Sequence, residues 1–112
     1  MFRRQEVLVR IQARVMWEVV QAGPDQHWFG VCRPLNLNAA GDTFEEFQAC
    51  ANEAITLLLQ SLLQRNELQA FLQRNGWRVA TPIPQPNARA RFELPYGIQF
   101  KDRFEELAGA SA

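Results

Sequence analysis

Apolar and polar residues alternate along the first long segment of the chain. Within residues 7–19 every odd position is apolar, namely Val7, Val9, Ile11, Ala13, Val15, Trp17 and Val19. A period of two is typical of a β-strand that buries one face. The pattern predicts one long strand whose even face is exposed or covered by a partner. The candidate partner-binding residues on that face are Arg10, Gln12, Arg14 and Met16.

Turn-forming residues after this segment predict an antiparallel meander. Gly23 and Pro24 lie in a turn, and an aromatic-rich strand follows over residues 27–32, with Trp28 as a further candidate for partner binding. After Pro34, apolar residues alternate with polar or small ones up to Gly41, which predicts a short third strand.

The next segment predicts a long helix. Thr43 can cap the free amides, and Glu46 can return the hydrogen bond three residues later, a capping box that contributes about 1 kcal/mol. Apolar residues then recur at steps of three and four, which forms a stripe suited to packing on a sheet. They are Phe47, Ala51, Ala54, Ile55, Leu58 and Leu62.

A short second helix with Leu68 and Leu72 is predicted to end at Gly76, and Trp77 to Val79 to rejoin the sheet as a strand. Residues 1–80 are thus a predicted core of three or four antiparallel strands packed on one long and one short helix, which is an α+β fold. Residues 81–87 contain three prolines and predict an extended connector.

The tail, residues 88–112, contains strand-like alternation around Phe92 and Leu94 and again at Ile98 and Phe100, and one or two helical turns are predicted over residues 102–108. These strands have no evident place in the core. Leu57, Leu59 and Leu63 also widen the helix stripe beyond the needs of one sheet face. These seven residues are the candidate oligomer interface, and we expect a dimer or tetramer in which the tail crosses to a neighbour.

Composition narrows the classes of function. Twelve basic and twelve acidic residues give zero net charge, so the chain has no global attraction to nucleic acid or to an anionic membrane. The segment MFRRQEV lacks the apolar stretch of a signal peptide, and no stretch suggests a membrane span. Two cysteines in such a chain are expected to be reduced, and the protein to be cytoplasmic.

Residues suited to catalysis are few. His27 is the single histidine, and it lacks zinc-finger spacing with Cys32 and Cys50. Asp42, Glu45 and Glu46 fall in the first turn of the predicted helix, where the helix dipole favours carboxylates without any metal. We therefore expect no enzyme activity, no cofactor and no metal site.

Nucleic-acid binding has weaker support in the sequence than protein binding. Arg10 and Arg14 share one predicted strand face, and Arg89 and Arg91 share another. The zero net charge and the lack of a helix-turn-helix pattern favour solvated arginines over a nucleic-acid interface.

The segment GDTFEEFQACANEAI, residues 41–55, resembles the GDT-x-EEA…A-x-EAI segment of HicB-like antitoxins. A long first strand, an aromatic second strand, the stretch Pro34-Leu35-Asn36-Leu37, this helix and a Leu- and Gln-rich extension occur in the same order in that family. The resemblance covers about residues 7 to 80. Phe47 differs from it, because the family commonly has Ala there, and Asn38-Ala39-Ala40 replaces a Pro-Gly-Cys-like turn.

The resemblance implies a partial RNase H-like α+β fold without nuclease carboxylates. It also implies binding and blocking of a small toxin ribonuclease, HicA, and assembly as a dimer or tetramer. Many members carry a C-terminal DNA-binding module. Residues 91–95 only partly match the strand that opens a ribbon-helix-helix, and too little chain follows for both helices, so direct DNA binding is not expected.

The sequence leaves two hypotheses for the function open. The first is a non-catalytic HicB-like antitoxin, or an orphan relative of one, that binds a HicA-type toxin, itself, or both. The second is a degenerate nuclease-like or RNA-binding domain.

Overall fold

A computed structural model describes residues 6–22 and 26–101 of the 112-residue chain. The elements in chain order are β1 (Val7–Gln12), β2 (Val15–Ala22), β3 (His27–Cys32), a 3₁₀ turn η1 (Arg33–Leu35), β4 (Leu37–Gly41), α1 (Phe44–Gln64), α2 (Leu68–Arg74), β5 (Arg78–Val79), β6 (Ala90–Glu93) and β7 (Tyr96–Lys101). The predicted α+β class, with one long and one short helix, is confirmed. The helical turns predicted over residues 102–108 lie outside the described residues.

The described chain divides into two compact units at other places than the sequence suggested. Unit 1 contains the residues up to Ala13 and residues 56–95, and unit 2 contains residues 14–55 together with those from Tyr96 onward. The division crosses the predicted core, residues 1–80, and it assigns the two strands of the predicted tail to different units.

The predicted single strand over residues 7–19 is two strands. β1 and β2 are separated by Ala13 and Arg14, and β1 belongs to unit 1 whereas β2 belongs to unit 2. The alternation continues through the break, because Val9, Ile11, Val15, Trp17 and Val19 are all at most 3% exposed. Because the interruption is two residues long, the odd positions stay buried on both sides of it. The sequence pattern therefore could not reveal the break.

Unit 2 contains a four-stranded sheet in the order β4-β3-β2-β7. The predicted meander is confirmed, since β2 pairs antiparallel with β3 and β3 with β4. The third strand begins later than predicted because Pro34 lies in η1 and Asn36 has a left-handed backbone, φ 54°. The fourth strand, β7, pairs parallel to β2, so the sheet is mixed rather than purely antiparallel.

Unit 1 contains a three-stranded sheet in the order β5-β1-β6. β5 pairs antiparallel with β1, which confirms that the segment after Gly76 rejoins a sheet. α2 precedes it and buries Leu68 and Leu72, and Gly76 follows with φ 68°, so the predicted left-handed end of the short helix is confirmed.

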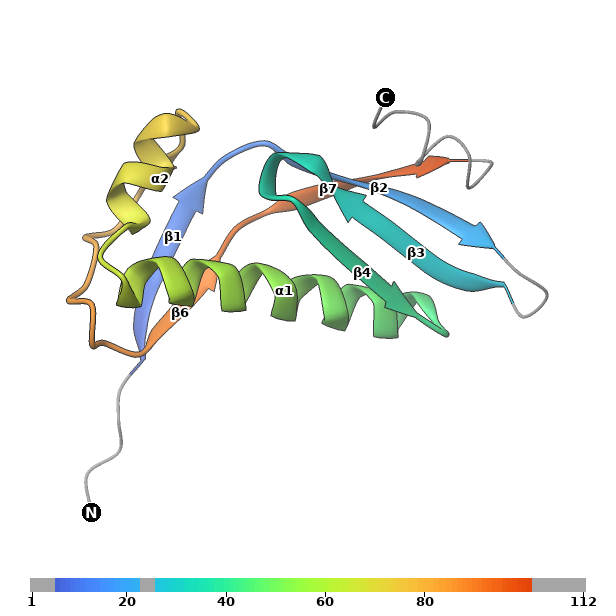
Figure 1. Ribbon diagram of the computed structural model, residues 1–112, viewed down its shortest axis with the longest axis horizontal. Helices are drawn as coiled ribbons and strands as arrows, with labels where there is room; N and C mark the ends of the chain where they lie inside the picture. Colours follow the sequence, from blue (N-terminus) through green and yellow to red (C-terminus); the bar gives the residue numbers. More distant parts are fainter. Residues whose placement is uncertain (1–5, 23–25, 102–112) are drawn as a thin grey trace, which may run out of the picture. The chain divides into compact units, whose positions relative to one another are not determined.

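Both strands of the predicted tail pair within their own chain. β6 is parallel to β1 and β7 is parallel to β2, as Figure 1 shows in orange and red beside the two blue strands. The expectation that these strands lack a place in the core is therefore wrong. Parallel partners some 80 residues apart leave no local signal in a sequence, because no tight turn joins them.

In unit 2 the start of α1 packs on the odd face of β2. The Trp17 and Phe47 rings meet edge to face, with centroids 5.8 Å apart, and both side chains are fully buried. The predicted orientation of strand and helix is confirmed at this contact. The opposite face of the sheet, which we call the outer face, contains the even positions of β2 and their partners across the strands.

Candidate functional site

The outer face of the unit 2 sheet exposes two large apolar side chains. Met16 on β2 is 47% exposed and Phe29 on β3 is 37% exposed. Phe29 pairs with Val20 across the strands, and Met16 is two places along from Glu18 on the same side of β2. Exposed methionine and aromatic side chains within one sheet face are typical of protein-binding surfaces.

Charged groups lie beside these apolar side chains. The Glu18 side chain is only 17% exposed, and its carboxylate accepts a hydrogen bond from Nε of Arg33. Lys101 places its Nζ 3.7 Å from the other Glu18 oxygen. Arg33 and Lys101 thus both approach the Glu18 carboxylate, so this part of the outer face contains charged groups of both signs. A partner that contributes an apolar side chain and complementary charges would suit it.

The candidate partner-binding residues are divided between the two units. Arg10 and Gln12 are exposed on β1 of unit 1, whereas Arg14 and Met16 belong to unit 2. Trp28 lies on the helix-packed face of β3, opposite to Met16, where its ring contacts Phe44 at 5.1 Å. Trp28 therefore does not share a face of the sheet with Met16, because it pairs with Gln21, an odd position of β2.

Trp28 is instead part of an aromatic group in unit 2. Phe100 on β7 contacts both Trp28 and Phe44 at 6.0 Å, and 61% of its surface is exposed. The sequence assigned Trp28 to a partner interface and Phe100 to an oligomer interface, and the structure brings them together. The contact depends on the parallel pairing of β7 with β2, which places Phe100 beside Val19.

Three of the six remaining oligomer candidates are buried. Leu59 is fully buried, Leu63 is 2% exposed and Leu94 is 9% exposed, so these three leucines belong to the core. Phe92 and Ile98 are half-buried. Leu57 is different, because 62% of its surface is exposed. Two of the three extra leucines on α1, Leu59 and Leu63, are therefore buried within the chain.

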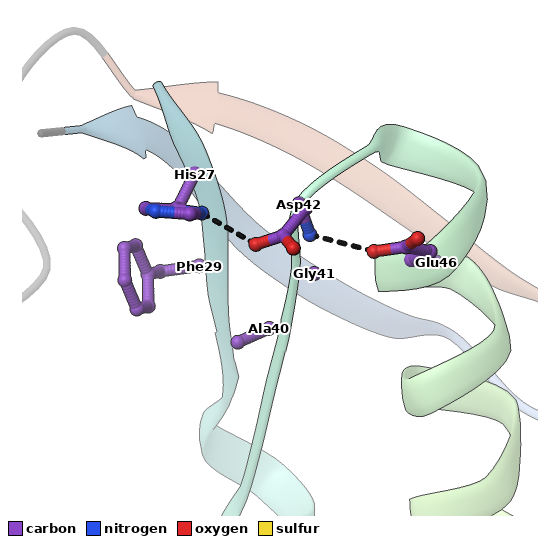
Figure 2. Close-up of a pocket in the computed structure, with 6 residues that line it drawn as sticks. All are labelled: His27, Phe29, Ala40, Gly41, Asp42 and Glu46. Carbon is purple, nitrogen blue, oxygen red and sulfur yellow. Dashed lines mark hydrogen bonds and ion pairs between the residues drawn. The ribbon is translucent and has the colours of Figure 1, made fainter. Parts of the chain in front are cut away.

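A second feature of unit 2 is an open pocket of about 400 Å³ at the end of β3 and β4 (Figure 2). It is lined by His27, Phe29, Ala40, Gly41, Asp42 and Glu46. The His27 ring places Nδ1 2.6 Å from the Asp42 carboxylate. His27 is the first residue of β3 and Asp42 directly follows β4, so the pairing of Trp28 with Gly41 across the two strands brings them together.

The Glu46 carboxylate of this pocket caps the start of α1. The Asp42 N–H donates to Glu46 Oε2 at 2.9 Å, and the Glu46 N–H donates to Thr43 Oγ1 at 3.1 Å. This confirms a cap at Thr43, with the Glu46 carboxylate reaching one residue further back than in the usual capping box. The GDT segment is thus explained as a helix start. The six lining residues include no hydroxyl or thiol nucleophile.

Gly41 is required by the same turn. A Cβ added there would lie 2.4 Å from the backbone nitrogen of Phe47, closer than real contacts allow. This close approach gives a structural reason for glycine in the GDT segment, independent of any ligand.

Cys32 and Cys50 do not form a disulfide with each other in the structure. Cys32 is fully buried, and desolvation raises the pKa of its thiol despite a hydrogen bond with the Leu35 backbone that lowers it. A neutral, buried thiol is a poor nucleophile.

Within the parts of the chain that the structure describes, no group of three or more His, Cys, Asp or Glu side chains is arranged to hold a metal ion. In the same parts, none of the helices has the length and apolar character needed to cross a membrane.

Comparisons of the chain with protein-family models, with curated proteins and with solved structures found no match.

Proposed function

We propose that this chain is a non-catalytic, HicB-like binding protein that engages a small HicA-type toxin ribonuclease, and that it also associates with itself. The proposal rests on the resemblance of residues 41–55 to HicB-like antitoxins. The observation that carries its binding role is the outer face of the unit 2 sheet, where exposed Met16 and Phe29 lie beside the charged group around Glu18.

The outer face suits a protein partner for a physical reason. Desolvating Met16 and Phe29 provides favourable burial, at about 25 cal/mol per Å² of apolar surface. The charged groups around Glu18 then favour partners whose charges complement them. A small toxin fits this face where it presents an apolar side chain beside a charged one.

The test is inhibition of a HicA-type toxin encoded beside this gene. The wild-type chain should suppress RNA cleavage by the toxin, and calorimetry should show a defined complex. The double substitution Met16→Asp/Phe29→Asp should weaken binding at least about thirtyfold, the scale of a hot-spot residue worth 2 kcal/mol or more.

Leu57→Asp is the control, because it adds an aspartate at an exposed apolar residue outside this face, as each substitution of the double variant does within it. It should leave toxin binding unchanged. Equal binding by the double variant and the wild type would remove the outer face from the proposal, and a toxin that the wild type neither binds nor inhibits would remove the proposed function.

The alternative is a degenerate nuclease-like or RNA-binding domain. Its nuclease form depends on Asp42, Glu45 and Glu46, which are exposed residues at the start of α1, and the Glu46 carboxylate is already engaged in the cap. We expect the purified chain to leave RNA and DNA intact with magnesium or manganese. Cleavage that disappears in Asp42→Asn or Glu46→Gln would establish the alternative.

A further inference from the structure

One face of the unit 1 sheet gathers arginines from three strands. The pairs across the strands are Leu8 with Arg91, Arg10 with Glu93, and Gln12 with Arg78. Directly paired residues project to the same side of a sheet. Because Val9 and Ile11 are buried on the other side, these residues form one outward face, which we call the arginine face. Arg10, Arg78 and Arg91 are all exposed there.

Two of these arginines have no acidic partner among residues 6–22 and 26–101. Arg10 donates from Nε to Glu93 Oε2 at 2.9 Å, so its charge is matched. Arg78 and Arg91 form no ion pair with any of the residues that the structure describes. Although the whole chain has zero net charge, this face has unmatched positive charge.

Arg89 extends the same face. It has the same parity as Arg91, its carbonyl accepts a hydrogen bond from the Val7 N–H at 2.9 Å, and its side chain is exposed. Exposed Glu6 at this end offsets part of the charge, and Arg89 makes no ion pair with it or with another described residue. This part of unit 1 therefore has four arginines and two glutamates, Glu6 and Glu93.

Arg89 also lines a polar pocket of about 290 Å³ in unit 1. The other lining residues are Gln60, Gln64, Asn87 and Ala88. The Gln60 amide is occupied, since it donates to the Ala88 carbonyl and accepts from the Ala90 N–H, both at 3.3 Å. The Gln64 and Asn87 side chains form no hydrogen bond with other described residues, so two carboxamides in the pocket remain available.

The spread of charge favours a polyanion over a single small anion. The partners of Arg78 and Arg91 on β1, Gln12 and Leu8, are four residues apart, roughly 13 Å at the rise of a β-strand. Guanidinium groups bind phosphate through two parallel hydrogen bonds. A carboxamide offers a donor and an acceptor side by side, which matches the edge of a nucleobase that is not paired.

We propose that unit 1 binds a single-stranded nucleic acid, with the backbone phosphates on Arg78, Arg91 and Arg89 and one unstacked base in the pocket beside Gln64 and Asn87. An acidic protein segment would satisfy the arginines but offers no planar base edge to the two carboxamides, so the nucleic acid is the better match. This activity uses residues of unit 1 and is independent of the proposed toxin-binding face of unit 2.

The test is fluorescence anisotropy of the full chain with a short labelled single-stranded RNA and the matching DNA, at several salt concentrations. The triple variant Arg78→Ala/Arg89→Ala/Arg91→Ala should bind at least about tenfold more weakly. The slope of log affinity against log salt should also fall by about two, because three phosphate contacts each contribute about 0.7 for a single strand.

The matched control is Arg14→Ala/Arg65→Ala/Arg74→Ala, which removes three exposed arginines elsewhere and changes the net charge equally. It should bind within about twofold of the wild type. Gln64→Ala/Asn87→Ala should change the ranking of short homopolymers of the four bases and leave the salt slope unchanged.

Three results would overturn the proposal: equal loss in both triple variants, no measurable RNA or DNA binding by the wild type at low salt, or tighter binding of a poly-glutamate peptide than of either nucleic acid. The last would assign the arginine face to an acidic protein segment. Each result is separate from toxin binding, which the triple variant should retain.

Discussion

Trp17 illustrates how single residues organise unit 2. Its ring is fully buried and packs edge to face against Phe47, and it also meets Tyr96 on β7, with ring centroids 6.3 Å apart. Burial raises the pKa of the Tyr96 hydroxyl, so this ring stays neutral over the physiological range. A strand residue predicted from alternation alone thus contacts both the helix and the parallel strand of the tail.

The parity of the first strands gives a prediction at this scale. Ile11→Asp or Trp17→Asp should prevent folding, because each buries a charge at a position at most 1% exposed. Arg10→Ala and Gln12→Ala alter exposed residues and should change the free energy of unfolding by less than about 0.5 kcal/mol. Circular dichroism melts compare the four variants. A tolerated Ile11→Asp together with a destabilising Gln12→Ala would show that the assigned register is inverted.

Two glycines provide a second comparison of single residues. In Gly41→Ala the new methyl group meets the Phe47 backbone at 2.4 Å, which cannot yield without moving α1. In Gly97→Ala it meets only the end of the Met16 side chain, at 3.0 Å, which can rotate away. We expect Gly41→Ala to lower the free energy of unfolding by about 1–3 kcal/mol, and Gly97→Ala to cost clearly less. Urea denaturation measures both, and a reversed order would contradict this account of the GDT turn.

At the scale of elements, the local signals of the sequence were sufficient for α1, α2 and the β2-β3-β4 meander. Each has a periodicity, a turn or a cap within a few residues, and these depend only on neighbours in the chain. The boundary between η1 and β4 was less accurate, because Pro34 and left-handed Asn36 delay the strand by two residues.

The start of α1 supports a prediction for an element. Thr43→Ala removes the oxygen that accepts from the Glu46 N–H and should destabilise the protein by about 1 kcal/mol. Glu46→Ala should cost a similar amount, because the Asp42 N–H loses its partner. Glu45→Ala is the control, since Glu45 is exposed in the same turn and should change stability little. Equal losses from Glu45→Ala and Glu46→Ala would indicate a dipole effect instead of a specific cap.

At the scale of the whole molecule, the strands of the tail pair with β1 and β2 of the same chain. Self-association therefore does not have to depend on strand exchange. Two large apolar side chains proposed for that interface remain exposed, Leu57 on α1 and Phe100 on β7.

We expect light scattering to report at least a dimer for the full chain at tens of micromolar, roughly the range of an ordinary dimer constant. Leu57→Asp or Phe100→Asp should raise the dissociation constant, whereas Met16→Asp should not. A shortened chain ending at Pro82 is unsuitable as a test, because it removes β6 and β7 and with them two strands of the fold. A monomeric full-length chain at that concentration would rule out self-association.

The sequence by itself determined the α+β class, the parity of the first strands, the meander, the helix start at Thr43 and the identity of the short helix. These features follow from contacts between residues close in the chain, which leave periodic and capping signals. Tertiary structure decided which residues share a surface. The parallel pairings of β6 and β7 set the neighbours of Phe100 and Arg91, the hairpin register turned Trp28 toward Phe44 and Phe29 outward, and the packing of α1 buried Leu59 and Leu63. Such placements depend on registers between distant segments, and a shift of one residue in any of them would move every side chain to the other face.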